Sequence, residues 1–233
     1  ALALRTRPLK LLGQGQPHRF RGNNSGVTGM TDLQFERFRE CASLNRHPGS
    51  SGPLTTGREE IVTLLGQLRG RDAALKISAA QRLAIFRDRS AAPALAGCLQ
   101  AETREVRVAA ALALAACGTR DSVAGLLDAL EDRDPLVATA ALTALGNLVG
   151  GHVAPFDAFA ELKLRKPQAQ AWRDWFQKHS WEAIERALIP RMRQPSPDPP
   201  RRAIVALGHI GGDTARAALR EFVKAESAKN PYP

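Results

Sequence analysis

Histidine and cysteine are the first side chains to consider for chemistry, because they act as acids, bases, nucleophiles and metal ligands near neutral pH. The chain has five histidines and three cysteines. Their spacing contains no Cys-x-x-Cys or His-x-x-x-His pair, and the chain has no Gly-x-Ser-x-Gly motif and no glycine-rich phosphate loop. The cysteines lie among apolar residues, which favours buried thiols and a cytoplasmic protein. We therefore predict no catalytic, cofactor-binding or metal-binding residue, no cofactor, and a protein that is not an enzyme.

The three tryptophans form the other unusual group, since Trp172, Trp175 and Trp181 lie within ten residues of one another. In one interpretation the rings fill a widened core. In the other, a tryptophan edge stays exposed near Arg173, Lys178 and His179 and forms a docking hot spot, because tryptophan and arginine are enriched at such sites. A Trp172→Ala variant would separate the two, since it would unfold the protein in the first case and lose only partner binding in the second.

The elements that carry these residues follow a fixed sequence period. The same pattern of small and large apolar residues returns every 31 positions, as in Leu83, Leu114 and Leu145. A second row contains Leu64, Leu95 and Leu126. A sustained period of this length is typical of stacked repeat proteins, in which each unit buries its apolar faces against its neighbours.

Each unit is expected to contain two antiparallel helices. Residues 104–117 show apolar side chains at the three-and-four spacing of one helical stripe. Asp72, Thr103 and Asp134 stand 31 residues apart and are expected to cap the second helices, while Ser90 and Asp121 are expected to cap first helices. We predict one continuous ladder of paired helices with no strand.

Three stretches carry a resemblance to a known family. They are AAPALAGCLQAETREVRVAAALALAACG (91–118), LEDRDPLVATAALTALGNL (130–148) and PPRRAIVALGHIGG (199–212). They resemble HEAT-repeat proteins of the short bacterial type, the phycobilisome-lyase HEAT-like repeats, over about residues 58–226. The resemblance implies an all-α fold, an α-solenoid (α/α superhelix) of about five and a half two-helix repeats with a 31-residue period.

This family includes adaptors, lyase subunits and enzymes, so the resemblance does not select a function. HEAT-repeat hydroxylases that bind two irons use paired His-Glu steps, and none of the five histidines here is followed by glutamate. The leading hypothesis is a non-enzymatic scaffold that binds a protein or peptide along its concave face. A lyase or lyase-accessory subunit for a protein-attached chromophore stays open as an alternative.

Four segments are expected along the chain. They are a disordered basic tail (1–29), a capping helix with a linker (30–57), the repeat solenoid (58–226) and a C-terminal tail (227–233). The chain opens on Ala1 rather than Met. Whether the tail belongs to the native mature chain therefore stays open, and so does the question of whether the protein is exported.

The net charge of +10 raises the question of a nucleic-acid partner. The basic tail carries +5, whereas residues 30–190 carry only +1. A solenoid that grips nucleic acid would need a continuous basic stripe, because phosphate contacts dominate such binding. A nucleic-acid-associated protein that uses the tail is therefore a further alternative, and no run of apolar residues predicts a membrane span.

The concave surface can be predicted from the period, because equivalent positions of successive second helices should line it. The residues predicted to bind the partner are mostly uncharged, which suits a protein better than a polyanion: Leu112, Thr143, Asn147, Trp172, Asp174, Lys178, Arg201 and His209. His209 shares its repeat position with Asn147 and Lys178, so we expect it to face solvent. Leu112, if exposed, would be an apolar anchor.

Overall fold

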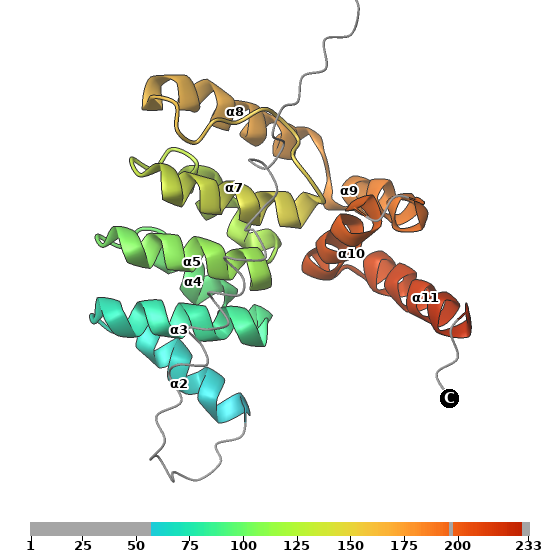
Figure 1. Ribbon diagram of the computed structural model, residues 1–233, viewed down its shortest axis with the longest axis horizontal. Helices are drawn as coiled ribbons and strands as arrows, with labels where there is room; N and C mark the ends of the chain where they lie inside the picture. Colours follow the sequence, from blue (N-terminus) through green and yellow to red (C-terminus); the bar gives the residue numbers. More distant parts are fainter. Residues whose placement is uncertain (1–56, 196–197, 230–233) are drawn as a thin grey trace, which may run out of the picture. The chain divides into compact units, whose positions relative to one another are not determined.

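The computed structural model describes residues 57–195 and 198–229, and all regular structure in these ranges is helical (Figure 1). The predicted tail (1–29), nearly all of the capping segment (30–57) and residues 230–233 lie outside the described residues. The first described helix is α2 (Gly57–Arg69), and the predicted solenoid starts at residue 58. The last one, α11 (Asp213–Lys229), continues three residues into the predicted C-terminal tail.

Three helix pairs form the first part of the fold. The first helices are α2, α4 (Ala92–Cys98) and α6 (Val123–Ala129), and short 3-10 turns precede α4 (η1, Arg89–Ala91) and α6 (η2, Arg120–Ser122). The second helices are α3 (Ala73–Phe86), α5 (Arg104–Cys117) and α7 (Pro135–Val149). Each first helix packs on its second helix, and α5 packs between α3 and α7, so that these three lie side by side in Figure 1.

Small and large apolar residues have different roles in the packing of this stack. Ala110, Ala141 and Ala144 are fully buried, and the absence of a larger side chain lets neighbouring helices approach closely. Leu114 and Leu145 are also fully buried and fill the space between units, each contributing about 1.5–3 kcal/mol. The predicted leucine rows belong to one continuous apolar core.

The helix starts follow the sequence signals in part. Asp72 caps α3 by accepting from the Ala74 and Leu75 amides, and Asp134 caps α7 by accepting from Leu136. Thr103 stands at the start of α5 but makes no side-chain cap bond. The expected caps Ser90 and Asp121 were wrong. Asp88 accepts from the Ser90 amide, and the Ser122 hydroxyl accepts from the Thr119 amide, because a 3-10 turn precedes each first helix.

The regular pairing ends after α7. No helix occurs between Gly150 and Glu161, and the next one is α8 (Leu162–Lys178). Trp172 on α8 is fully buried, and its Nε1 donates to the Ala154 carbonyl at 3.2 Å. A ring of this size stands where α7 has an alanine, so α8 does not approach α7 as closely as α7 approaches α5.

Two arginines attach α8 to the end of α6 instead. Arg165 is buried and donates to the Asp132 carbonyl at 2.7 Å. Arg173 forms ion pairs with Asp128 and Glu131. The position that holds a capping residue in the earlier units therefore holds a side chain that binds free backbone carbonyls.

The C-terminal module, which we define as residues 181–229, departs from the predicted ladder. It contains α9 (Trp181–Leu188), η3 (Ile189–Arg193), α10 (Asp198–Ile210) and α11. In place of stacking on α8, α10 packs against α7, as Figure 1 shows. Its last turn reaches the segments that follow α3 and α5, where Arg89 donates to the His209 carbonyl at 2.5 Å. The prediction of one continuous ladder was therefore wrong beyond α7. Within the described ranges, no helix is both long and apolar enough to span a bilayer.

Candidate partner-binding face

The candidate site is the side of α3, α5 and α7 that faces away from the first helices. We call it the second-helix face. Its side chains are half-buried or exposed and mostly uncharged: Ile77, Gln81, Ile85, Val108, Leu112, Leu136, Thr139 and Thr143. Two of its apolar members are well exposed, with Ile85 at 53% and Leu136 at 48%. Adjacent helices thus present a neutral surface with apolar patches across the stack.

Local hydrogen bonds fix the polar side chains of this face. Thr143 donates through its hydroxyl to the Thr139 carbonyl at 2.9 Å. The Asn147 amide donates to the Ala115 carbonyl at 2.8 Å, which joins α7 to α5. Leu112 is half-buried against the core, so only part of its side chain remains for an anchor. These three predicted residues come together on neighbouring helices.

The other predicted residues lie apart from this group. Asp174 and Lys178 are on α8, where Asp174 accepts from Gln170 at 2.7 Å and Lys178 is exposed. Arg201 is exposed on α10, a different element. Trp172 belongs to the core, as described above. The structure therefore separates the eight predicted residues into at least three places.

His209 was expected to face solvent, and this expectation was wrong. It is 8% exposed, and its Nδ1 lies 3.0 Å from the Gly118 carbonyl at the end of α5. The reason is the unexpected position of α10. Because α10 packs against α7, the side of α10 that carries His209 contacts the end of α5 instead of solvent. Burial lowers the pKa of the His209 imidazole, and the nearby charges of Arg89 and Arg87 lower it further.

The sequence analysis missed the arginines that hold α10 in place. Arg120 donates to the Ile210 carbonyl at 3.2 Å and to Glu185 at 2.5 Å. Arg191 donates to the Gly150 carbonyl at 2.9 Å. A signal was present, because Arg89 and Arg120 are one period of 31 residues apart. Both provide positive charge at the C-terminal end of α10, where free carbonyls and the helix dipole favour it.

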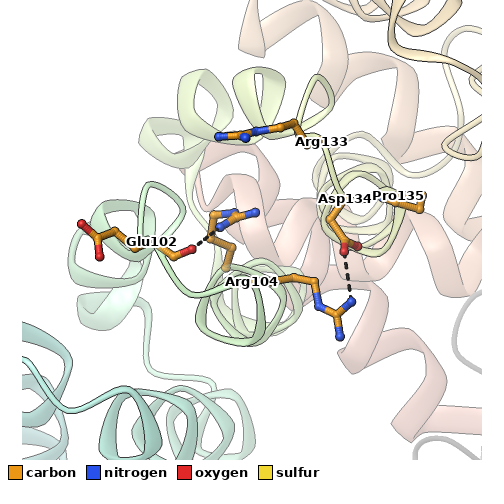
Figure 2. Close-up of a pocket in the computed structure, with 6 residues that line it drawn as sticks. Glu102, Arg104, Arg133, Asp134 and Pro135 are labelled. Carbon is orange, nitrogen blue, oxygen red and sulfur yellow. Dashed lines mark hydrogen bonds and ion pairs between the residues drawn. The ribbon is translucent and has the colours of Figure 1, made fainter.

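An open hollow of about 390 Å³ lies at the N-terminal ends of α5 and α7 (Figure 2). Arg107 donates there to both carboxylate oxygens of Asp132, at 2.7 and 3.1 Å, and to the Glu102 carbonyl at 2.9 Å. Arg104 pairs with Asp134 at 3.3 Å. Most of the positive charge of the hollow is therefore neutralised within the fold, so the hollow provides no concentrated site for an anion.

Both cysteines in the described part of the chain are buried free thiols. Burial raises the pKa of the Cys117 thiol to about 12, and its Sγ lies 3.2 Å from the Ala113 carbonyl. Burial also raises the pKa of Cys98. A thiol in this state is a poor nucleophile, because the thiolate is the reactive form.

The paired helices and shared core of α2 to α7 fit an α-solenoid of helical repeats. Residues 61–154 match the family model of the HEAT repeats, which agrees with this architecture. The match ends inside the segment between α7 and α8, where the regular pairing ends. A search of curated proteins found no match to the chain.

Proposed function

We propose that this protein is a non-enzymatic scaffold that binds a protein partner along the second-helix face. HEAT repeats generally mediate protein–protein interactions, and stacked repeats provide extended surfaces for them. The observation that carries the proposal is the composition of this face. Ile85, Leu112 and Leu136 place apolar area on three successive helices, and the side chains among them are neutral apart from Glu105.

This composition favours a partner with an apolar surface over a polyanion. Desolvating a neutral face costs little, whereas nucleic acid requires a row of cations for its phosphates. Glu105 is the acidic residue at the start of α5, and Arg104 pairs with it at 3.2 Å. The exposed cations Lys178 and Arg201 lie on other elements, where they would contact the edge of a bound partner.

The sequence pattern supports the finer parts of this proposal. We infer that α2 to α7 form three units of the 31-residue period, and that the later part of the chain keeps the period in sequence with a different packing. The resemblance to the phycobilisome-lyase type is kept as a hypothesis about relationship only. The buried thiols fit a cytoplasmic location, which we also propose.

No observation on the described residues favours the lyase alternative. That activity would require an acid or base in a pocket of ligand size. In the hollow in Figure 2, Arg104 pairs with Asp134 and Arg107 pairs with Asp132, and the lining contains no histidine or cysteine.

A charge placed on the second-helix face tests the proposal. We would compare cross-linked partners of the full chain and of a Leu112→Arg variant, after circular dichroism shows that the variant keeps its helices. The control is Val62→Arg, which adds the same charge to α2 at a side chain that is 65% exposed. We expect the unmodified chain and the control to capture the same partners. Leu112→Arg should no longer capture them. Equal capture by all three proteins would contradict the proposal.

The alternative partner class is tested with the same proteins. Binding to a DNA duplex would be measured at low and high salt, with the full chain and with residues 1–29 removed. Salt-dependent binding that needs the tail and ignores Leu112→Arg would favour a nucleic-acid function over the scaffold.

A further inference from the structure

Hydrogen bonds to backbone carbonyls join the C-terminal module to the repeat stack, beside the apolar contact of α10 with α7. Arg89 and Arg120 bind the carbonyls of His209 and Ile210 at the end of α10, and Arg191 binds the carbonyl of Gly150 after α7. His209 completes the seam from the module side through the Gly118 carbonyl. It is therefore the one histidine among the described residues that is both buried and placed between these two parts.

The partner of His209 determines where its proton lies. A carbonyl oxygen only accepts, so Nδ1 must carry the hydrogen and donate it to Gly118. The neutral imidazole then leaves Nε2 unprotonated. A second proton, which would make the ring positive, has to be added at Nε2 while the ring is enclosed in the seam.

Arg89 and Arg87 place positive charge near the ring, and the acidic groups of the neighbouring elements have partners of their own. The segment between α3 and α4 contributes Arg87, Asp88 and Arg89, and Asp88 accepts from the Ser90 amide. Arg120 lies in η2, between α5 and α6, and is paired with Glu185 of α9. The start of α11 has Asp213, which pairs with Arg216. The last turn of α7 has no titratable group.

We propose that His209 is a proton-sensitive latch, so that protonation of its ring opens the C-terminal module away from the repeat stack. In the closed seam the extra charge is desolvated and lies close to Arg87 and Arg89. In the open form the ring is hydrated and takes the proton freely. Opening therefore binds a proton and becomes more favourable as pH falls.

The sign and size of the effect follow from linkage. The lowered pKa of His209 in the closed form means that the open form binds more protons below the ordinary value of 6.5. The opening equilibrium constant should rise by up to about tenfold for each pH unit below that value, until the ring titrates in the closed form as well. Above pH 6.5 the His209 ring is neutral in both forms, so it does not destabilise the closed form.

Opening would change the surface that the protein presents. It would uncover the buried side of α10, with Ala203, Ala206 and Leu207, and the guanidinium groups of Arg89 and Arg120. The device is independent of the scaffold proposal, since it concerns contacts within the chain.

Hydrogen exchange of the full chain would test the latch at about pH 7 and about pH 5, with each rate corrected for the intrinsic effect of pH. We expect protection in α10 and α11 to fall by about tenfold or more, while protection in α3 and α5 changes little. Unchanged protection in the module would overturn the proposal. An equal loss throughout the chain would overturn it too, because that result means global destabilisation.

Two variants assign the effect to His209. His209→Asn retains a donor for Gly118 and removes the titration, so module protection should no longer depend on pH.

Arg87→Asn removes a repelling charge at a position with φ of +53°, which asparagine tolerates. It should weaken the pH dependence even if His209→Asn docks poorly. His179→Gln, at an exposed residue directly after α8, is the control and should behave as the unmodified chain does. A pH dependence that is the same in Arg87→Asn and in His179→Gln would overturn the assignment.

Discussion

Arg120 and Glu185 form an ion pair across 65 residues of sequence, with Nη2 of Arg120 2.5 Å from Oε1 of Glu185. The Glu185 side chain is only 4% exposed, and Arg120 also lies over the ring of Trp181, 5.4 Å from its centroid. Arg120 extends from η2 of the stack, while both of its partners belong to α9 of the C-terminal module. This one side chain therefore joins the two parts of the fold.

We predict that Arg120→Met destabilises the protein by about 2–3 kcal/mol, because it leaves the buried Glu185 carboxylate without its cation. The value is below that of a fully buried pair, since Arg120 is 31% exposed. The double variant Arg120→Met with Glu185→Leu should recover part of the loss. Urea unfolding of the unmodified chain, of Arg120→Met, of Glu185→Leu and of the double variant measures this coupling. If the double variant lost the sum of the two single losses, the pair would have no role.

A second prediction concerns the core of the repeat stack. Leu114 is fully buried between units, so Leu114→Ala should cost about 2–5 kcal/mol through lost burial and the cavity that remains. Leu136→Ala makes the same change at a side chain that is 48% exposed and should cost less than about 0.5 kcal/mol. Thermal unfolding would compare the two variants. Equal losses would contradict the assignment of the leucine row to the core.

The sequence predicted the first three helix pairs well because their packing is local and repetitive. Each second helix meets an equivalent neighbour, so the spacing of Ala110, Leu114 and their counterparts describes both the helix and its contacts. The neutral face that contains Leu112 and Thr143 follows from the same spacing. Most of the candidate site therefore depends on information that one repeat unit already contains.

The later part of the chain depends on contacts that no local period records. Trp172 shows that α8 cannot approach as an alanine-faced helix does, but it does not show where α10 goes. That position depends on Arg89 and Arg120 meeting carbonyls about 90 to 120 residues away. Because such bonds use the backbone of the partner, the partner sequence carries no trace of them. For this reason His209 was placed on the wrong surface.

The tryptophan cluster leads to a third prediction. Trp172→Ala should destabilise the protein by about 3–5 kcal/mol, because it removes a fully buried ring together with the bond from Nε1 to Ala154. Trp175→Ala is the matched control on the same helix, where the ring is half-buried and stacks on His179 at 4.3 Å. Its cost should be clearly smaller. Chemical unfolding would rank the two variants, and the opposite order would return Trp172 to the docking interpretation.

The last prediction uses Cys117 and Cys98, the two buried cysteines of the described residues, as reporters of opening. Cys117 should resist alkylation by iodoacetamide near neutral pH, since its pKa of about 12 leaves almost no thiolate and its side chain is 1% exposed. Cys98, whose pKa is also raised and which lies at the end of α4, should be protected as well. Both should react fully in urea, which mass spectrometry of the labelled peptides would show. Because Cys117 directly precedes Gly118, opening of the seam should label Cys117 before Cys98. Labelling of Cys98 before Cys117 would show that the end of α4 opens before the seam does.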